Sequence, residues 1–211
     1  MKEKNDINKI VSNEILKRTI DISIEYSELS LDTFLEEGLL KEIPFVKSIV
    51  GFYNISNSFI ERHKVSKILT FFKTFHEGNI NEEKLEKFKE KFNADKTYQN
   101  KVIEIIVLFN ERFLQIEKSK ILANLLLAHI NNELSWEEFQ DISMILEVIH
   151  PRGFDFLHEI SKELNWANQM AFNVDEVFMI ACGIGYRTGS RFYISHYGQK
   201  LFNLGIKPLN K

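Results

Sequence analysis

The spacing of apolar residues predicts a mainly helical chain. Over most of the sequence, apolar residues recur every three or four positions, which is the period of an amphipathic helix. Residues 102–109 are apolar on almost every side, which predicts a helix surrounded by others. The clearest apolar faces are Ile7, Ile10, Val11, Ile15 and Leu16, then Tyr98, Val102, Ile105, Ile106, Phe109, Phe113 and Ile116, and, after a polar run at 117–120, Ile121, Leu122, Leu125, Leu126 and Ile130.

Three stretches in the first half are less regular. Residues 20–26 alternate apolar and polar side chains as a strand would, but no partner strand follows, so we predict a helix. Gly38 and the Ile43-Pro44 pair predict a turn, because the residue before a proline is biased away from the helical conformation. The apolar stripe over 52–75 slips in phase at Arg62-His63, which predicts one bent helix or two abutting helices.

Two later helix starts carry explicit capping signals. Asn81 is placed to cap a helix, with apolar residues at the two staple positions that flank a helix entrance. Ser135 and Glu138 form the S-x-x-E capping box and are flanked in the same way. Each start follows a short polar turn, so the sequence predicts two helical hairpins.

The chain after Ser135 has a different order of elements. We predict three helices, a two-stranded β-ribbon and a closing helix, which is the plan of a winged helix. The predicted elements are a helix to Ile149 stopped at His150-Pro151, helices over 153–164 and 174–181, a turn at 188–190, a strand over 191–195 and a last helix over 196–204 that Gly205 stops. The predicted fold is therefore mainly α, with a multi-helix bundle over 1–130 and a winged-helix-like unit over 135–211, separate or packed as one unit.

Residues 183–205 resemble the end of many winged-helix domains. Tyr193-Ile194-Ser195, followed by Tyr197-Gly198-Gln199-Lys200-Leu201, is similar to the point where a wing strand runs into a helix that starts Tyr, aliphatic, Thr or Ser, two residues, Gly. This resemblance implies a fold and does not imply a ligand.

A second resemblance spans more of the chain. The segment Gly38-Leu39-Leu40-Lys41-Glu42-Ile43-Pro44, the glycine at Gly51, and Arg62 through Lys67 to Phe71 are similar to a segment of uncharacterised bacterial proteins. The order of elements resembles the bacterial abortive-infection alpha type, which is associated with phage resistance. The resemblance implies a bacterial protein of phage defence.

Charge and composition restrict the classes of function. The net charge is −3 and the pI is near 6.1, so no global field attracts the chain to nucleic acid or anionic lipid. The single cysteine, Cys182, excludes an intramolecular disulfide and the paired spacing of a zinc site, and it suits a reducing compartment. The N-terminus lacks the apolar core of a signal peptide, so we predict a cytoplasmic protein. The uncharged stretch 48–60 has 13 residues, fewer than the ~20 that span a bilayer.

The charge of the C-terminal region disfavours DNA as the partner. The helix predicted over 174–181 would read DNA in a winged helix, but it contains Asp175 and Glu176 and no Lys or Arg. From residue 135 onward, 7 basic residues face 9 acidic ones. Arg187 and Arg191 could touch a DNA backbone from the wing. A contact surface for protein remains the favoured interpretation.

We predict no catalytic, cofactor-binding or metal-binding residues. The glycines over 183–189 follow a helix and precede a strand, which is the reverse of a phosphate loop, so they are expected at turns of the ribbon. The six histidines do not show the spacing of a zinc helix, and neither marked helix start supplies calcium ligands. Cys182 with His196 is the one candidate nucleophile pair, yet a lone cysteine that ends an apolar helix is typically a buried hydrophobe.

A basic cluster offers a possible interaction surface. Arg62, His63, Lys64 and Lys67 follow the uncharged apolar stretch, and this combination can lay a helix on an anionic membrane. The competing interpretation is the solvated face of a core helix. Together with Arg187 and Arg191, these residues form the predicted interaction surface.

The predicted function is non-enzymatic and acts through contact with a protein partner or a second copy, in phage defence as the resemblance implies. The alternatives are a membrane-active abortive-infection effector and a DNA-binding regulator. An enzyme with a distributed active site stays open, because such sites need no linear motif. No small-molecule substrate is evident from the sequence.

Overall fold

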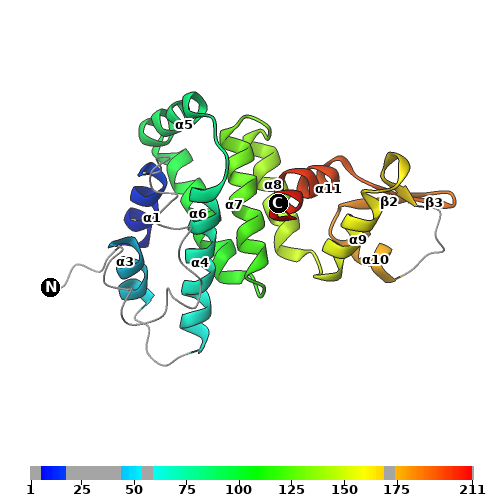
Figure 1. Ribbon diagram of the computed structural model, residues 1–211, viewed down its shortest axis with the longest axis horizontal. Helices are drawn as coiled ribbons and strands as arrows, with labels where there is room; N and C mark the ends of the chain where they lie inside the picture. Colours follow the sequence, from blue (N-terminus) through cyan, green and yellow to red (C-terminus); the bar gives the residue numbers. More distant parts are fainter. Residues whose placement is uncertain (1–5, 18–43, 54–58, 169–173, 211) are drawn as a thin grey trace. The chain divides into compact units, whose positions relative to one another are not determined.

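The chain divides into two compact units, Met1–Ala123 (unit 1) and Asn124–Lys211 (unit 2). The computed structural model describes residues 6–17, 44–53, 59–168 and 174–210 (Figure 1). The boundary lies within helix α7 (Glu117–Ile130). The domains predicted from the sequence, 1–130 and 135–211, would place it in the turn that follows this helix.

Unit 1 is a bundle of helices around an aromatic core. Its helices are α1 (Ile7–Leu16), α3 (Pro44–Tyr53), α4 (Phe59–Glu77), α5 (Glu82–Ala94), α6 (Lys96–Arg112) and the first half of α7. Helix α6 packs against α1, α4 and α5, and α3 packs against α1 and α4. Phe45 of α3 meets Phe72 of α4 edge to face at 4.7 Å between ring centroids, next to the buried Phe71 and Phe75. The Phe-rich composition therefore supplies the core between these helices.

The helix predicted from the first apolar face is confirmed, and α1 covers the predicted residues. The strand-like stretch at 20–26 and the turn at 38–43 lie outside the described residues. Pro44 occupies the first position of α3, where its fixed φ and missing N–H are tolerated. The phase slip at Arg62-His63 lies in the first turns of α4, which begins at Phe59, so it marks no junction between helices.

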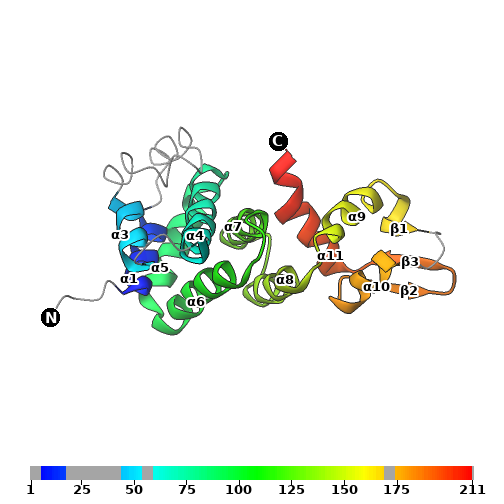
Figure 2. The same cartoon turned by 90° about the horizontal axis from the view of Figure 1, so that it is seen from below.

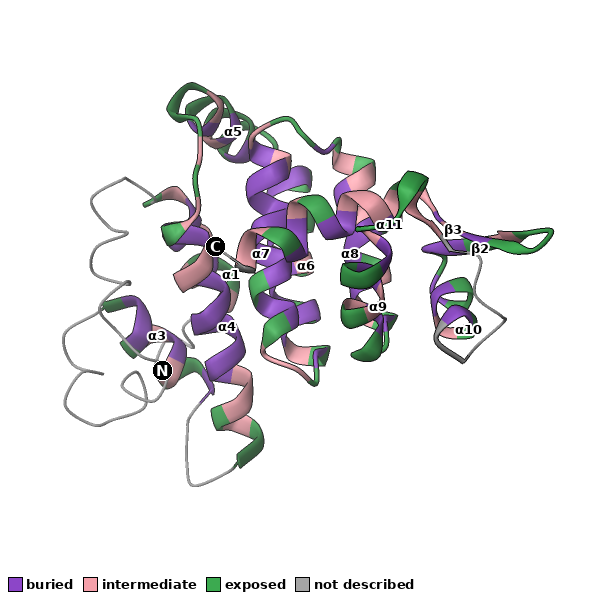
Figure 3. Cartoon of the chain, turned by 45° about the vertical axis from the view of Figure 1, so that its right-hand side comes forward, coloured by how far each residue is buried: buried purple, intermediate pink, exposed green. Residues whose placement is uncertain are grey.

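Helix α7, rather than α6, is the helix buried on all sides. Residues 121–128 of α7 are all buried (Figure 3). In α6, by contrast, Glu104 and Leu108 are exposed. The prediction of an enclosed helix at 102–109 was therefore wrong. The small residues Ala123 and Ala128 of α7 are buried with the larger apolar side chains of this stretch, and the polar run 117–120 forms the first turn of the helix.

Unit 2 combines helices with a small antiparallel sheet. Its strands β1 (Ala167–Asn168), β2 (Gly185–Thr188) and β3 (Arg191–Ile194) lie in the order β1-β3-β2 (Figure 2). Tyr186 pairs with Tyr193 in the β2–β3 hairpin. The other elements are the second half of α7, α8 (Trp136–Val148), α9 (Arg152–Ile160), a 3-10 turn (Leu164–Trp166), α10 (Val174–Ala181), α11 (His196–Lys200), a π-helical turn (Leu201–Ile206) and a 3-10 turn (Lys207–Asn210).

This architecture confirms the predicted fold class, a helical bundle followed by a small unit with a β-ribbon. Two details differ. A third strand, β1, joins the ribbon, and α9 ends at Ile160 instead of 164. A two-residue strand is too short to show alternation, and its pairing with β3 is not local in sequence.

The local helix signals predicted the caps correctly. The Asn81 side chain accepts a hydrogen bond from the Lys84 amide, and Ser135 forms a complete capping box with Glu138. Ser195 caps α11 by accepting from the Gly198 amide at 3.2 Å.

Gly198 and Gly205, the two glycines after strand β3, have different structural roles. A Cβ at Gly198 would lie 2.7 Å from the Ile184 carbonyl oxygen, so only glycine fits between α11 and the chain before β2. Gly205 does not stop the helical segment as predicted, because the π-helical turn continues through it to Ile206. Its carbonyl oxygen instead accepts a hydrogen bond from Asn124 Nδ2 at 2.9 Å.

Candidate interaction surfaces

The predicted interaction residues belong to both units and differ in burial. In unit 1, Arg62 is exposed at the start of α4. His63 Nε2 donates to the Leu114 carbonyl oxygen at 2.9 Å, and Lys64 Nζ lies 3.6 Å from Glu61 Oε1. These side chains remain at the surface of unit 1 near the point where α6 ends.

Lys67 is not part of that surface. Its side chain is 2% exposed, and Nζ donates to the carbonyl oxygens of Glu111, at 2.9 Å, and Phe113. These carbonyls lie at the C-terminal end of α6, where the helix itself provides no donors. Burial lowers the pKa of Lys67, against the opposing effect of the Glu111 charge. Lys67 is therefore a buried cap for α6, and the prediction of a solvated or lipid-facing lysine was wrong.

Tyr53 makes a second connection to the same end of α6. Its hydroxyl donates to Glu111 Oε1 at 2.8 Å, and its side chain is buried. Burial and the hydrogen bond to the carboxylate raise the pKa of Tyr53 well above its ordinary range. The Glu111 carboxylate thus accepts a hydrogen bond from Tyr53 of α3, and the Glu111 carbonyl accepts one from Lys67 of α4. These two hydrogen bonds connect α3 and α4 to the end of α6.

We expect Tyr53→Phe to make unit 1 less sensitive to alkaline pH. The folded-state pKa of Tyr53 is raised, so its contribution to stability is present below the unfolded pKa of about 10 and is lost as the pH rises above it. Above that pH, wild type should lose up to about 1.4 kcal/mol more per pH unit than the variant. Urea unfolding at a series of pH values measures this difference. Tyr186→Phe, a change at an exposed tyrosine of unit 2, is the control, and equal alkaline slopes in all three proteins would contradict the assignment.

In unit 2, Arg187 forms an ion pair with a buried carboxylate. Its Nε donates to Glu176 Oε2 at 3.0 Å, Nη2 contacts the same oxygen, and Nη1 donates to the Ser190 carbonyl at 3.0 Å. Glu176 lies on α10 and is fully buried. The arginine expected to touch a partner from the wing thus connects the hairpin to α10. Arg191, on β3, remains exposed.

The outer face of α10 is apolar. Val177 is 43% exposed and Ile180 is 42% exposed, whereas Glu176 and Met179 point into the unit and are buried. The sequence did not predict which residues would be exposed, because α10 carries apolar residues at most of its positions. Only the packing of α10 on α9 and β2 decides which of them face outward.

The candidate nucleophile pair has separate neighbours. Cys182 is buried and its Sγ donates to the Met179 carbonyl oxygen at 3.5 Å, while the exposed His196 has Nε2 3.7 Å from Glu138 Oε1. Gly189, with a φ of +58°, lies in the turn between β2 and β3, as predicted for the ribbon. Gly183, with a φ of +80°, instead follows the end of α10, and Gly185 lies within strand β2.

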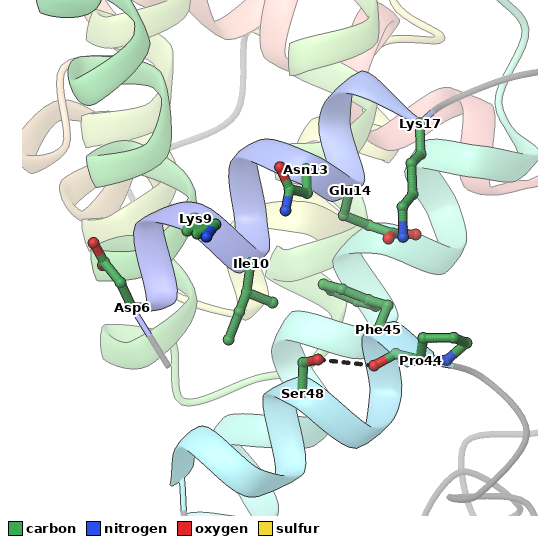
Figure 4. Close-up of a pocket in the computed structure, with 9 residues that line it drawn as sticks. All are labelled: Asp6, Lys9, Ile10, Asn13, Glu14, Lys17, Pro44, Phe45 and Ser48. Carbon is green, nitrogen blue, oxygen red and sulfur yellow. Dashed lines mark hydrogen bonds between the residues drawn. The ribbon is translucent and has the colours of Figure 1, made fainter. Parts of the chain in front are cut away.

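A small groove of about 220 Å³ lies between α1 and α3 (Figure 4). Ser48 Oγ donates to the Pro44 carbonyl at 2.9 Å along one wall, and the buried Glu14 on the other side accepts from His76 Nε2 at 3.0 Å. Lys17, the last described residue after α1, and Pro44, the first residue of α3, both line this groove. Its lining residues are Asp6, Lys9, Ile10, Asn13, Glu14, Lys17, Pro44, Phe45 and Ser48.

No protein family, curated protein or solved structure matches this chain.

Within residues 6–17, 44–53, 59–168 and 174–210, no helix combines the length and apolar character needed to cross a bilayer. The same part of the chain contains no group of three or more His, Cys, Asp or Glu side chains that could hold a metal ion.

Proposed function

We propose that this protein is a non-enzymatic, cytoplasmic component of bacterial phage defence that acts through contact with another protein. The single observation that supports the contact is the outer face of α10, where Val177 and Ile180 are exposed together. Exposed apolar side chains one helical turn apart are typical of surfaces that bury a partner.

The charge around α10 favours protein over DNA. A DNA-reading helix presents basic or amide side chains to base edges and phosphates. Here the outward residues Val177 and Ile180 are aliphatic, and the Arg187 guanidinium is bound to Glu176. Arg191 alone remains as an exposed cation on the described part of the β2–β3 hairpin. Phosphate contacts, which supply most of the affinity for nucleic acid, would have few donors on this surface.

The experiment is affinity purification of the full chain from a bacterium that carries the gene, followed by reconstitution with the purified partner. Val177→Glu/Ile180→Glu is the test variant, and Leu164→Glu, a change at another exposed apolar residue of unit 2, is the control. We expect the double variant to bind at least about tenfold more weakly, because two buried contacts become charged, and the control to bind as wild type does.

Three results would contradict the proposal. The first is recovery of no protein whose binding depends on Val177 and Ile180. The second is equal binding by the double variant and wild type. The third is retention of wild type on DNA at physiological salt with loss in Arg191→Glu, which would favour the regulator. The defence role rests on the family resemblance, and it requires that deletion of the gene raise phage plating efficiency and that the Val177→Glu/Ile180→Glu gene fail to restore resistance.

A further inference from the structure

One end of unit 1 exposes three large apolar side chains. Phe59 and Ile60, in the first turn of α4, are 80% and 63% exposed, and Leu114, in the connection between α6 and α7, is 77% exposed. We call these three residues the apolar tip. They come from segments about 50 positions apart in the sequence. Such strong exposure of three large apolar side chains indicates a surface that another phase or molecule covers.

Hydrogen bonds and ring stacking fix the tip. His63 connects the start of α4 to the segment that contains Leu114. The His63 Nε2 donates to the Leu114 carbonyl, and the His63 ring stacks on the Phe59 ring, with 6.0 Å between centroids and 5° between planes. Next to Leu114, the Phe113 carbonyl accepts from the buried Lys67. The connection after α6 is thus held against α4, and the apolar side chains project from a supported backbone.

Basic residues outnumber acidic ones around the tip. Arg62 and Lys64 follow Phe59 and Ile60 in α4, and Arg112 precedes Leu114 at the end of α6. The two acidic residues in these stretches are Glu61, which pairs with Lys64, and Glu111, which accepts from the Tyr53 hydroxyl. Three basic residues against two acidic ones leave an excess of one positive charge at the tip, on a chain whose net charge is −3.

We propose that the apolar tip docks unit 1 on an anionic lipid bilayer. Phe59, Ile60 and Leu114 enter the boundary between headgroups and acyl chains, and Arg62, Lys64 and Arg112 contact lipid phosphates. Apolar residues with adjacent cations are the combination that binds this boundary, and both parts are needed for stable attachment. The basic residues beside the tip favour anionic lipid as the occupant, because phosphate headgroups pair with cations while the acyl boundary takes up the apolar side chains. This inference concerns unit 1 and does not depend on the protein contact proposed for unit 2.

The test is flotation of the full chain with vesicles of phosphatidylcholine alone or with one third phosphatidylglycerol. Phe59→Ala/Leu114→Ala removes apolar contacts, and Arg62→Glu reverses a charge. Leu164→Ala and Lys87→Glu are the matched controls, an exposed apolar residue and an exposed cation away from the tip. We expect wild type and both controls to float with the anionic vesicles, and both tip variants to bind about tenfold more weakly. Added salt should weaken binding by wild type.

Four outcomes would overturn the proposal. In the first, wild type fails to float with the anionic vesicles, and in the second it floats equally well with the neutral vesicles. In the third, Phe59→Ala/Leu114→Ala binds the anionic vesicles as strongly as wild type does. In the fourth, wild type binds no vesicles but forms a dimer in solution that the same double variant abolishes. The last result would assign the tip to a second copy of the chain. Because the substituted side chains are exposed, unchanged circular dichroism and thermal unfolding should accompany each variant, and these measurements separate lost docking from lost folding.

Discussion

Lys67→Ala is expected to lower the unfolding free energy of unit 1 by about 3–5 kcal/mol, a large part of the stability of an ordinary domain. The substitution removes the donors that satisfy the Glu111 and Phe113 carbonyls and leaves space where the aliphatic stem was packed. A buried carbonyl that loses its partner costs about 1–3 kcal/mol, and the cavity adds to this cost. Chemical denaturation measures the change.

Two further variants separate the causes. Lys67→Met keeps most of the side-chain volume, so it should cost less than Lys67→Ala and report mainly the lost hydrogen bonds. Burial lowers the pKa of Lys67, and the methionine no longer has to hold a charge in that position. Lys73→Ala changes a lysine on the same helix whose partner is Glu77 near the surface, and it should cost less than about 1 kcal/mol. Similar stability of Lys67→Ala and Lys73→Ala would show that other groups satisfy the carbonyls of α6.

Arg187→Ala should destabilise unit 2 by about 3 kcal/mol, because it removes the guanidinium from a carboxylate that has no exposure to water. Thermal unfolding, followed by the tryptophans of unit 2, should show the loss. Arg191→Ala, at an exposed position of the same hairpin, should stay within about 0.5 kcal/mol of wild type.

The double variant Glu176→Met/Arg187→Leu tests the same pair in the opposite direction. It replaces both charges with apolar side chains, so it should recover most of the stability that Arg187→Ala loses. If the double variant is as unstable as the single one, the ion pair is not the source of the loss. The result also decides how DNA binding is examined, because loss of binding in Arg187→Ala would report a damaged fold, whereas Arg191→Glu leaves the Glu176 pair intact.

Local signals explain the parts of the fold that the sequence predicted. The caps at Asn81 and Ser135 depend on residues three positions away, and α10 matches its predicted range because glycine follows it closely. The missed elements depend on distant residues. Strand β1 forms by pairing with Tyr193 and Phe192 of β3. Gly205 lies inside a helical segment, and its carbonyl oxygen accepts a hydrogen bond from the distant Asn124.

The features of the candidate surfaces that the sequence did not predict also depend on residues distant in the sequence. A helical stripe shows that Lys67 lies in α4, but it cannot show that two carbonyls more than forty residues away will surround its ammonium. Arg187 was predicted as a surface cation because its carboxylate partner lies on another element. The exposure of Phe59 and Leu114 was also hidden, because apolar residues near helix ends match a core pattern.

The position of the unit boundary inside α7 has a consequence for how such proteins diversify. Recombination usually exchanges domains at exposed linkers between elements. Here a crossover in the turn after Ile130 would leave behind Asn124, whose side chain donates to Gly205 in the C-terminal segment. Inheritance of unit 2 as a working module therefore requires the second half of α7 to travel with it, so exchange should be found where two parents share a compatible helix at that position.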